Sequence, residues 1–485
     1  MNAPLFLCRT LVIAVAMCCP LFVQAQIAPM SFEEIMSGLP DFLKSVDPPH
    51  DSVPEGVELP ALTLEHCVEQ ALQNNEELLQ SIEDQAIREA QAGQARSGRK
   101  PTLTGEAAYT YVEGMPQSVG NPLLESFIGS GTFTSEKGQT NMFLRLEQVL
   151  YAGGQINNAV RAAESLATAE GWRYQVTRAQ IEAATRTAYY NALLANALVT
   201  VARASIDAFS RHAKDAQTLL DAGVATQFDV LRAQTELGAQ ESALENAQSN
   251  LEIALLNLKR LMAMPVATPI RLEGLVAWPE VNEPLDACVA QALQYRPEIQ
   301  ALEGARAAAE YTLEARKGLY KPKVAVSAEY NDNRGGGTLV PEGMTYNAGV
   351  QWKLYDGGMR KHQRLEAKAQ LRRTELEAQA LLNTVELDVR TAYRRLQEAV
   401  VQIRTETKTL ELAEEGVRMA RIRFQEGIGT QTETIDAQLS DIQAQTALVQ
   451  AMRNYGVAAA ELQRAIGTPS APSLNGEPES ATQPE

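Results

Sequence analysis

The sequence predicts a mainly helical fold with a small set of β-strands, in which one structural unit occurs twice along 485 residues. Three observations lead to this prediction. The chain matches itself at an offset of about 200 residues, two stretches in each copy alternate apolar and polar residues, and the remaining bulk repeats apolar residues every seven positions. Each copy should therefore contain a helix, a β-hairpin and a long antiparallel helical hairpin.

The first 25 residues have the features of a secretory signal peptide. Arg9 precedes an apolar stretch, and the run VQA at 23–25 places small residues where a signal peptidase cuts. We expect the mature chain to start at Gln26. A membrane anchor is disfavoured, because the apolar stretch is shorter than the roughly 18 to 20 residues of a spanning helix and no later stretch is expected to reach that length. Lipid attachment at Cys18 or Cys19 is a further alternative.

The repeat is clearest at the start of each copy and after its strands. Residues 64–73 (LEHCVEQALQ) return as residues 285–294 (LDACVAQALQ), at an offset of 221. The run LYAGG at 150–154 returns as LYDGG at 354–358, at an offset of 204. The difference between the two offsets places 17 additional residues in the first copy before Leu150. A surface loop tolerates such an insertion most easily.

Two terminal segments lie outside the repeat. A Pro-rich segment precedes the first copy and an acidic tail follows the second, and both compositions are typical of peripheral or disordered chain. The predicted parts are the signal peptide at 1–25, the Pro-rich extension at 26–61, the first copy at 62–266 with its β-hairpin at about 102–151 and helical hairpin at about 153–264, the second copy at 284–467 with the corresponding hairpins at about 323–355 and 357–466, and the tail at 468–485.

The composition excludes several classes of function. A net charge of −17 argues against a nucleic-acid partner. Cys67 and Cys288, the cysteines left after signal removal, occupy the same position in each copy, which indicates a small buried helix position and no disulfide framework. Residues 93–100 resemble a phosphate loop, but Arg99 replaces its lysine and the segment precedes a strand, the reverse of the required order. The sequence also contains no nucleophile elbow, so we expect no enzymatic activity and no cofactor. We expect no metal site, since the histidines are scattered at His50, His66, His212 and His362 without metal-ligand spacing.

Each copy contains two stretches with the alternation of a β-strand. Each stretch is about ten residues long, which is the length that crosses an outer membrane at a tilt. A half-buried sheet in a soluble domain would show the same alternation. The apolar members are Leu103, Ala107, Tyr109 and Tyr111; Met142, Leu144 and Leu146; Val324, Val326, Ala328 and Tyr330; and Tyr346, Ala348, Val350, Trp352 and Leu354.

Four strands cannot close a barrel around a lumen, and the outer two would remain unpaired edges. Several chains must therefore contribute strands if the sheet lies in a membrane. Two, three or four chains would give about eight, twelve or sixteen strands, all of which are even numbers found in outer-membrane barrels. The residues alone leave these three assemblies open.

The other long segments carry the apolar repeat of a coiled coil. From Val230, leucines recur every seven residues as far as Leu258, and in the second copy alanines do the same from Ala437 to Ala465. Alanine at the seam allows closely packed helices. Residues 155–220 would form a rod on the order of 100 Å long at about 1.5 Å per residue. Such a rod is far longer than a compact domain.

Each rod ends in a glycine-containing turn, with the sequence DAGVAT at 221–226 and EGIGT at 426–430. Glycine ends one helix, and Thr226 or Thr430 can cap the next. Such a turn can be a simple reversal of the chain. Because it is exposed and rich in small residues, it can also be a docking point for a partner.

These features together resemble the TolC-like outer-membrane efflux protein family over about residues 62–467. The motifs are ALQNNEEL at 71–78, LYxGG after both β-hairpins, and FxxGxxTxxE at 424–433 leading to Ala437-Gln438. The resemblance implies a homotrimer in the cell outer membrane, with a shared 12-stranded β-barrel in the lipid and an α-helical tunnel extending into the periplasm.

The resemblance further implies an exit duct of a tripartite efflux or type I secretion system. In such a system the channel receives substrate from a periplasmic adaptor (membrane fusion) protein and an inner-membrane pump of the RND, ABC or MFS type. The pump selects the substrate, so the sequence of the duct does not name it. The alternative from the residues alone is a periplasmic or surface coiled-coil scaffold without a channel.

The family also implies roles for residues at the tips. Family members contact the adaptor through these turns, which assigns adaptor docking to Gly223, Val224, Gly427 and Ile428 of this chain.

A ring of acidic side chains narrows the periplasmic entrance in the family, and this gate matches Glu433 and Asp436, which are three residues apart on one helix face. Asp229 matches Glu433 in the first copy, whereas Arg232 stands where Asp436 does. The ring would then be acidic only from alternate hairpins. A solvated helix face is the simpler interpretation of the same residues.

Overall fold

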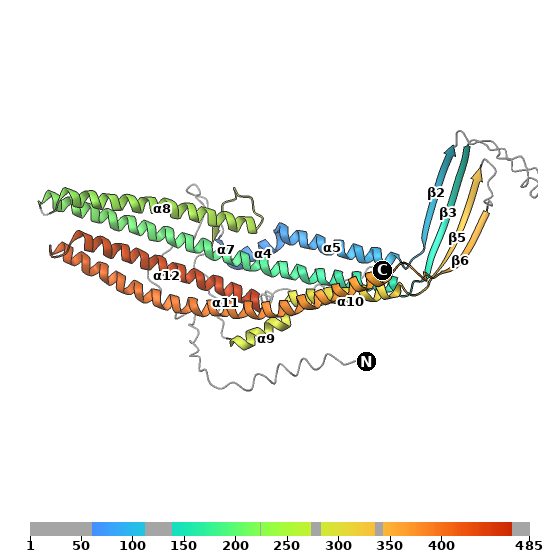
Figure 1. Cartoon of the computed structure of the whole chain (residues 1–485). Helices are drawn as coiled ribbons and strands as arrows, with labels where there is room; N and C mark the ends of the chain where they lie inside the picture. The colour runs from blue at the N-terminus through green and yellow to red at the C-terminus, as the bar shows by residue number, and fades with distance from the viewer. Residues whose placement is uncertain (1–60, 112–137, 224, 273–282, 335–342, 468–485) are drawn as a thin grey trace, which may run out of the picture.

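The computed structural model describes residues 61–111, 138–223, 225–272, 283–334 and 343–467. The predicted signal peptide, the lipidation positions, nearly all of the Pro-rich extension and the acidic tail lie outside these residues. The described part is elongated, with long helices along its length and a four-stranded sheet at one end (Figure 1).

Two helical hairpins form the half of the rod that lies away from the sheet. α7 (Gln155–Asp221) returns as α8 (Gln227–Leu261), and α11 (Met359–Gln425) returns as α12 (Gln431–Ile466). Since α7 also packs against α12, the helices lie in the order α8-α7-α12-α11 (Figure 1). α7 and α11 have 67 residues each, which gives rods of about 100 Å, as predicted.

Shorter helices flank the long ones in the half nearer the sheet. α5 (Glu76–Ser97) packs on α7, and α10 (Pro297–Gly318) packs between α7 and α11. The order here is therefore α5-α7-α10-α11. α8 and α5 form one outer side of the helical layer, and α11 forms the other; we call these the two edges of the layer.

The strands form one antiparallel sheet in the order β2-β3-β5-β6. Its members are β2 (Thr102–Tyr111), β3 (Gly138–Tyr151), β5 (Lys323–Arg334) and β6 (Gly343–Gln351). The pairing of β3 with β5 joins the two copies of the repeat. Within one chain β2 and β6 each have a neighbour on one side only, so the sheet is open.

The two faces of the sheet differ in polarity. One face carries exposed apolar side chains, among them Leu144 at 53% exposure, Tyr346 at 75% and Val350 at 70%. On the other face Arg145 of β3 lies opposite Glu329 of β5 and forms an ion pair with it. The apolar face requires a cover of lipid or protein.

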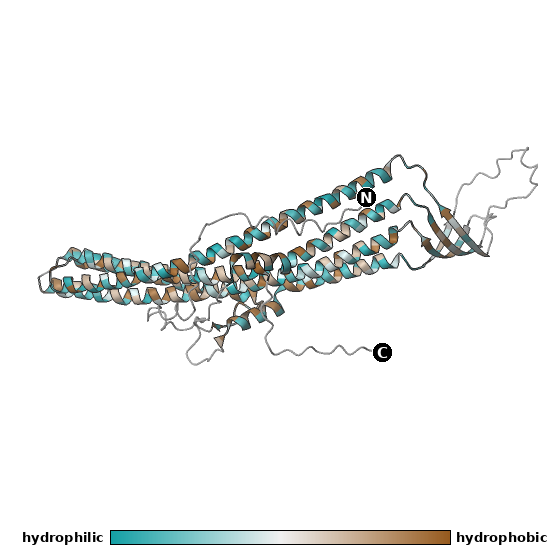
Figure 2. Cartoon of the chain, turned by 90° about the horizontal axis from the view of Figure 1, so that it is seen from below, coloured by the Kyte–Doolittle hydropathy of each residue, from teal (hydrophilic) through white to brown (hydrophobic). Residues whose placement is uncertain are grey.

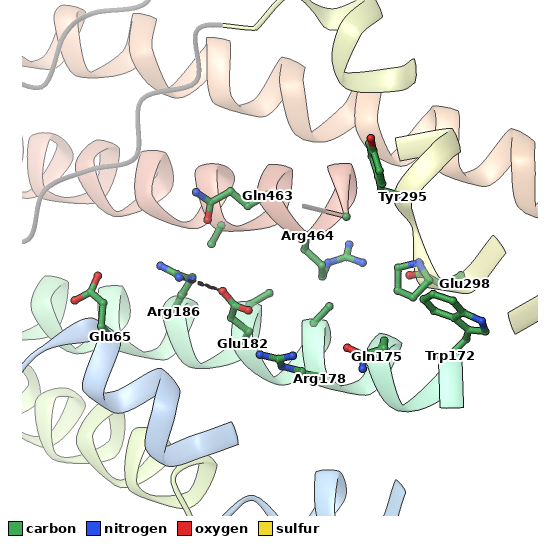
Figure 3. A pocket seen from close by; sticks show the side chains of 15 residues that line it. Glu65, Trp172, Gln175, Arg178, Glu182, Arg186, Tyr295, Glu298, Gln463 and Arg464 are labelled. Carbon is green, nitrogen blue, oxygen red and sulfur yellow. Dashed lines mark hydrogen bonds and ion pairs between the residues drawn. The ribbon is translucent and has the colours of Figure 1, made fainter. Parts of the chain in front are cut away.

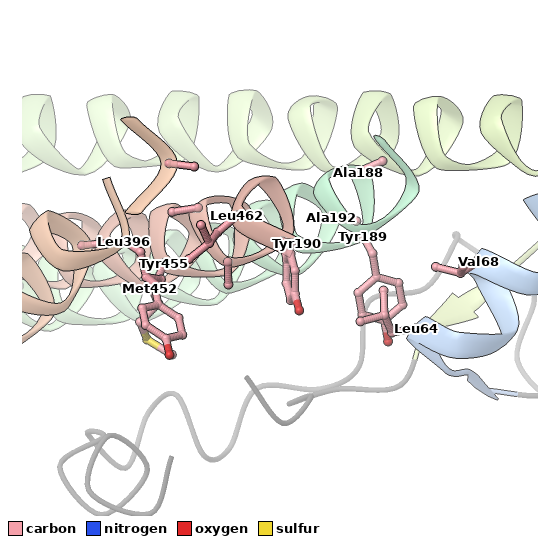
Figure 4. Close-up of a cluster of buried hydrophobic side chains, with 14 of the residues drawn as sticks. Leu64, Val68, Ala188, Tyr189, Tyr190, Ala192, Leu396, Met452, Tyr455 and Leu462 are labelled. Carbon is pink, nitrogen blue, oxygen red and sulfur yellow. The ribbon is translucent and has the colours of Figure 1, made fainter. Parts of the chain in front are cut away.

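The hydrophobic core is concentrated at the waist, where α4 (Leu64–Asn74) and α9 (Leu285–Tyr295) pack on the middle of the long helices (Figure 4). A two-residue parallel pairing of β1 (Ala61–Leu62) with β4 (Arg271–Leu272) lies beside it. The Tyr189 hydroxyl donates a hydrogen bond to the Leu62 carbonyl across this region (3.3 Å).

The two cysteines are free and buried. Each lies in the short helix that opens its copy, Cys67 in α4 and Cys288 in α9. Burial raises the pKa of Cys67 to about 12, so its reactive thiolate is suppressed. The structure agrees with the prediction of a duplicated small core position.

Two sequence expectations were wrong. The last strand was expected to include Trp352 and Leu354, but β6 ends at Gln351, because its partner strand β5 begins at Lys323, directly opposite Gln351. Among the described helices, α7 contains a stretch long and apolar enough by composition to cross a membrane, although no stretch after the N-terminus was expected to reach that length. The physical reason is its central position: 44% of the stretch is buried, because α7 packs against helices on several sides. Apolar residues are concentrated in this middle region and on the strands (Figure 2).

Candidate functional site: the hairpin tips and the open edges

The two tips share one backbone conformation. Gly223 ends the α7 turn at φ +76°, and Gly427 ends the α11 turn at φ +75°. A Cβ atom at either position would meet no other atom within 4 Å, so the conformation and not crowding requires glycine. Ile428 is 73% exposed at the second tip, and Val224 lies outside the described residues.

The first tip is closed by a reciprocal cap. The backbone N–H of Asp229 donates to the Thr226 hydroxyl (3.3 Å), and the Asp229 carboxylate accepts from the N–H (2.9 Å) and the hydroxyl (2.7 Å) of Thr226. These hydrogen bonds hold the pKa of Asp229 below its usual value. The carboxylate predicted for a gate is thus already bound to its own helix start.

The acidic residues of the second tip have different surroundings. The Glu433 N–H donates to the Thr430 hydroxyl (3.2 Å), while the Glu433 carboxylate lies 3.6 Å from the Arg423 guanidinium. The side chain of Glu433 is 48% exposed, and Asp436 is exposed one turn further on. The structure therefore brings Glu433 and Asp436 together on one accessible face, whereas the Asp229 carboxylate is bound within the cap of α8.

Two hydrogen bonds join the first tip to the second. The Gln431 side-chain amide donates to the Asp229 carbonyl (2.7 Å), and the Arg232 guanidinium donates to the Thr432 hydroxyl (2.9 Å). Sequence reasoning missed Gln431, since its partner lies 202 residues away. Arg232 was noticed only as a departure from the acidic pattern, and its side chain contacts the other tip.

The waist carries a charged cavity that sequence reasoning did not predict. It has a volume of about 540 Å³ and lies between α7, α12 and the start of α10 (Figure 3). Arg186 forms an ion pair with Glu182 there (3.0 Å). Three arginines and three glutamates balance in charge, and the remaining walls include Trp172 and Tyr295. No group of three or more His, Cys, Asp or Glu suited to a metal occurs in the described ranges of the chain.

Exposed apolar side chains run along both edges of the helical layer. α5 and α8 lie on one side of the layer and α11 on the other, so the two sets of apolar side chains lie on helices at opposite edges. The unpaired strands β2 and β6 likewise lie on opposite sides of the sheet. The exposed residues include Leu365, Leu376, Leu387, Leu412 and Met419 on α11, and they are Leu79, Ile82 and Ile87 on α5 and Phe228, Leu231 and Ile253 on α8.

The family model described as outer membrane efflux protein matches residues 67–264 and 288–468. The chain belongs to the outer membrane efflux protein family. The two matched ranges coincide with the two copies of the repeat to within a few residues at each end, in agreement with the resemblance stated from the motifs. The protein is a TolC-like efflux channel of the outer membrane, and its helices extend into the periplasm.

Individual relatives agree with this assignment. The chain is 24% identical to the outer membrane efflux protein BepC of Brucella suis over 420 residues, which cover 85% of this chain and 87% of BepC. It is 27% identical to the outer membrane protein TolC of Escherichia coli over 199 residues, or 40% of this chain and 38% of TolC. Its fold matches the outer membrane protein VceC of Vibrio cholerae with a TM-score of 0.70 at 18% identity, covering 83% of this chain and 96% of VceC.

Proposed function

We propose that three copies of the chain close into one channel, with a shared 12-stranded barrel in the outer membrane and a continuous helical tunnel below it. The observation that carries this proposal is the pair of open edges at both levels of the molecule. β2 and β6 are unpaired on opposite sides of the sheet, and apolar side chains are exposed on opposite sides of the helical layer. Copies related by rotation would cover all four edges at once.

Channel formation is tested by adding the detergent-extracted protein to a planar lipid bilayer. The proposal predicts discrete steps of conductance from an open duct. A coiled-coil scaffold, the alternative from the residues alone, would leave the bilayer impermeable. Family membership favours the channel, because the family model and the relative BepC are both described as outer membrane efflux proteins.

We further propose that the channel is the exit duct of a tripartite efflux or type I secretion system. In this assignment the tips at Gly223, Val224, Gly427 and Ile428 contact a periplasmic adaptor, and an inner-membrane pump of the RND, ABC or MFS type supplies the substrate. The exposure of Ile428 at the far end of the rod supports a contact surface.

Docking is tested with two variants of the second tip. Gly427→Trp places a bulky side chain at a positive φ, and Ile428→Ser removes an exposed apolar side chain without changing the turn. Both should abolish export in cells while the extracted protein keeps the oligomeric mass of the parent. Normal export by Ile428→Ser would contradict the docking role, even if Gly427→Trp fails through strain in the turn.

We propose that Glu433 and Asp436 form an acidic gate at the tunnel entrance and that Asp229 contributes less, because its carboxylate is engaged in the cap of α8. Replacing both Glu433 and Asp436 by Ala should raise single-channel conductance. The control is Glu411→Ala with Glu414→Ala, a pair of exposed carboxylates with the same spacing further up α11. Equal conductance in the gate variant and the control would contradict the gate and show that Glu433 and Asp436 only form a solvated helix face.

We further propose that residues 1–25 are a signal peptide that is removed, and that residues 26–61 and 468–485 are peripheral segments outside the channel. The mature N-terminus should be Gln26. Mass spectrometry of the purified envelope protein would detect this end, and an acylated Cys18 or Cys19 would instead support the lipidated form.

A further inference from the structure

A band of basic side chains lies where the helices meet the sheet. The segments 96–101, 316–323 and 352–364 connect α5, α10 and α11 to their strands, and we call them the basic collar. They contain three, four and four Lys or Arg residues, and Asp356 is their one acidic residue. The concentration stands out because the whole chain has a net charge of −17.

Most of these charges have no carboxylate partner. Three are paired: Arg96 with Glu164, Lys317 with Glu314 and Arg360 with Asp356. For the other members, the described part of the chain offers no carboxylate within ion-pair distance, so their charge is available to an external anion. These members are Arg99, Lys100, Arg316, Lys321, Lys323, Lys353, Lys361 and Arg364.

Aromatic side chains accompany the basic ones. Tyr320, Trp352 and Tyr355 are 40%, 59% and 86% exposed, and the Trp352 indole N–H donates to the Tyr320 carbonyl (3.1 Å). The guanidinium groups of Arg360 and Arg364 lie 4.9 and 5.9 Å from the centre of the Tyr320 ring. Exposed Trp and Tyr beside long basic side chains are typical of the boundary between lipid and water.

The position of the collar identifies the membrane leaflet. The apolar face of the strands ends at the collar, and the helices continue from it away from the sheet (Figure 1). With the sheet crossing the outer membrane as proposed above, the collar would lie at the level of the headgroups of the periplasmic leaflet.

We propose that the basic collar binds the anionic phospholipid headgroups of the periplasmic leaflet of the outer membrane. This inference rests on the proposed crossing of the membrane by the sheet. Each Lys or Arg near an anionic surface strengthens binding by about fivefold, and the effect falls off within about one Debye length, roughly 10 Å at 0.1 M salt. A cluster of several unpaired charges around the rod should give a clear preference for anionic over zwitterionic lipid.

The test compares the parent with a neutralised collar, Arg99→Gln, Lys100→Gln, Lys321→Gln and Arg364→Gln, in which all four replaced side chains are exposed. The matched control replaces two arginines and two lysines on the distal rod, Arg203→Gln, Lys214→Gln, Arg404→Gln and Lys408→Gln, which are also exposed. Each protein is reconstituted into nanodiscs that contain phosphatidylglycerol and phosphatidylcholine. Native mass spectrometry then counts the lipids of each kind retained on the protein.

The parent and the control should retain phosphatidylglycerol preferentially. In the neutralised collar, the ratio of retained phosphatidylglycerol to phosphatidylcholine should fall by at least about tenfold. Added salt should lower this ratio in the parent. Equal retention of the two lipids by the parent, or an unchanged preference in the neutralised collar, would overturn the proposal. Conductance in a neutral bilayer is recorded in parallel: a conducting channel without lipid preference refutes the collar alone, whereas failure to insert refutes the membrane-crossing sheet and the collar with it.

Discussion

At the waist, a side chain in each copy of the repeat donates a hydrogen bond to the equivalent backbone carbonyl at a helix end, but the donating residue differs between the copies. Asn75, between α4 and α5, donates its side-chain N–H to the Leu261 carbonyl at the end of α8 (2.9 Å). Arg296, between α9 and α10, donates its Nε–H to the Ala465 carbonyl at the end of α12 (2.6 Å). Asn75 and Arg296 are separated by the same offset of 221 as the starts of the copies, so these contacts are equivalent. We call them the two clasps.

The clasps differ in what their side chains require. Asn75 is also the N-cap of α5, where its side-chain oxygen accepts from the N–H groups of Glu77 and Leu78. Arg296 is 2% exposed, and its charge is met by Asp388 at 3.2 Å, while its Nη2 has no hydrogen-bond partner among the described residues. The position of the acceptor carbonyl is therefore the same in both copies, whereas the side chain that donates the hydrogen bond can change.

Removing the second clasp should have the largest effect. Arg296→Ala deletes a charged hydrogen bond to a buried helix end and leaves a cavity, which we expect to cost about 2 to 4 kcal/mol of stability. Thermal unfolding of the extracted protein measures the loss. The control is Arg395→Ala, whose ion pair with Glu461 is exposed, at an expected cost below about 1 kcal/mol. Equal unfolding of both variants would show that the clasp does not hold the waist.

The first clasp should contribute less, at about 1 to 2 kcal/mol for Asn75→Ala, because only neutral hydrogen bonds are lost. Asn75→Asp keeps the cap acceptor of α5 and removes the donor to Leu261, so it separates the two roles. A stability close to that of the parent would assign the whole effect to the cap. The same thermal unfolding assay reports both variants.

Local patterns predicted much of the fold. The alternation around Leu144 and Tyr346, the heptads after Val230 and the glycine turns each depend on neighbours within a few residues, and the structure contains the corresponding strands, helices and reversals. The clasps could not be predicted, because Asn75 and its partner are 186 residues apart.

The candidate site shows the same limit. Thr226 and Thr430 were expected to cap their helices, and both do so. The hydrogen bond from Gln431 to the backbone of the other tip depends on how the two hairpins pack, which no local pattern encodes.

The tips should show a smaller difference between the copies. Because the pKa of Asp229 is lowered in the folded protein, its carboxylate contributes stability that is present above its ordinary pKa and is lost as the pH falls through the lowered value. Asp229→Asn should therefore increase amide hydrogen exchange at the start of α8 at neutral pH. In this variant the protection of these amides should no longer decrease when the pH falls through the lowered pKa of Asp229. Glu433→Gln should change exchange at the start of α12 less. The reverse order would contradict the assignment of the reciprocal cap to the first tip.

The smallest expected difference concerns the two thiols. Burial raises the pKa of both Cys67 and Cys288, so neither should react with a maleimide at pH 8 in the native channel. Both should react after unfolding. Labelling of either cysteine in the native channel would show that the short helices at the waist open on the timescale of the reaction.

The central claim, that the open edges of one chain are closed by two further copies, is tested most directly by the mass of the protein extracted from the outer membrane. Light scattering in detergent, corrected for the bound micelle, should give a particle of three chains. A particle of one chain in the same detergent, with β2, β6 and the apolar edges left uncovered, would contradict the account.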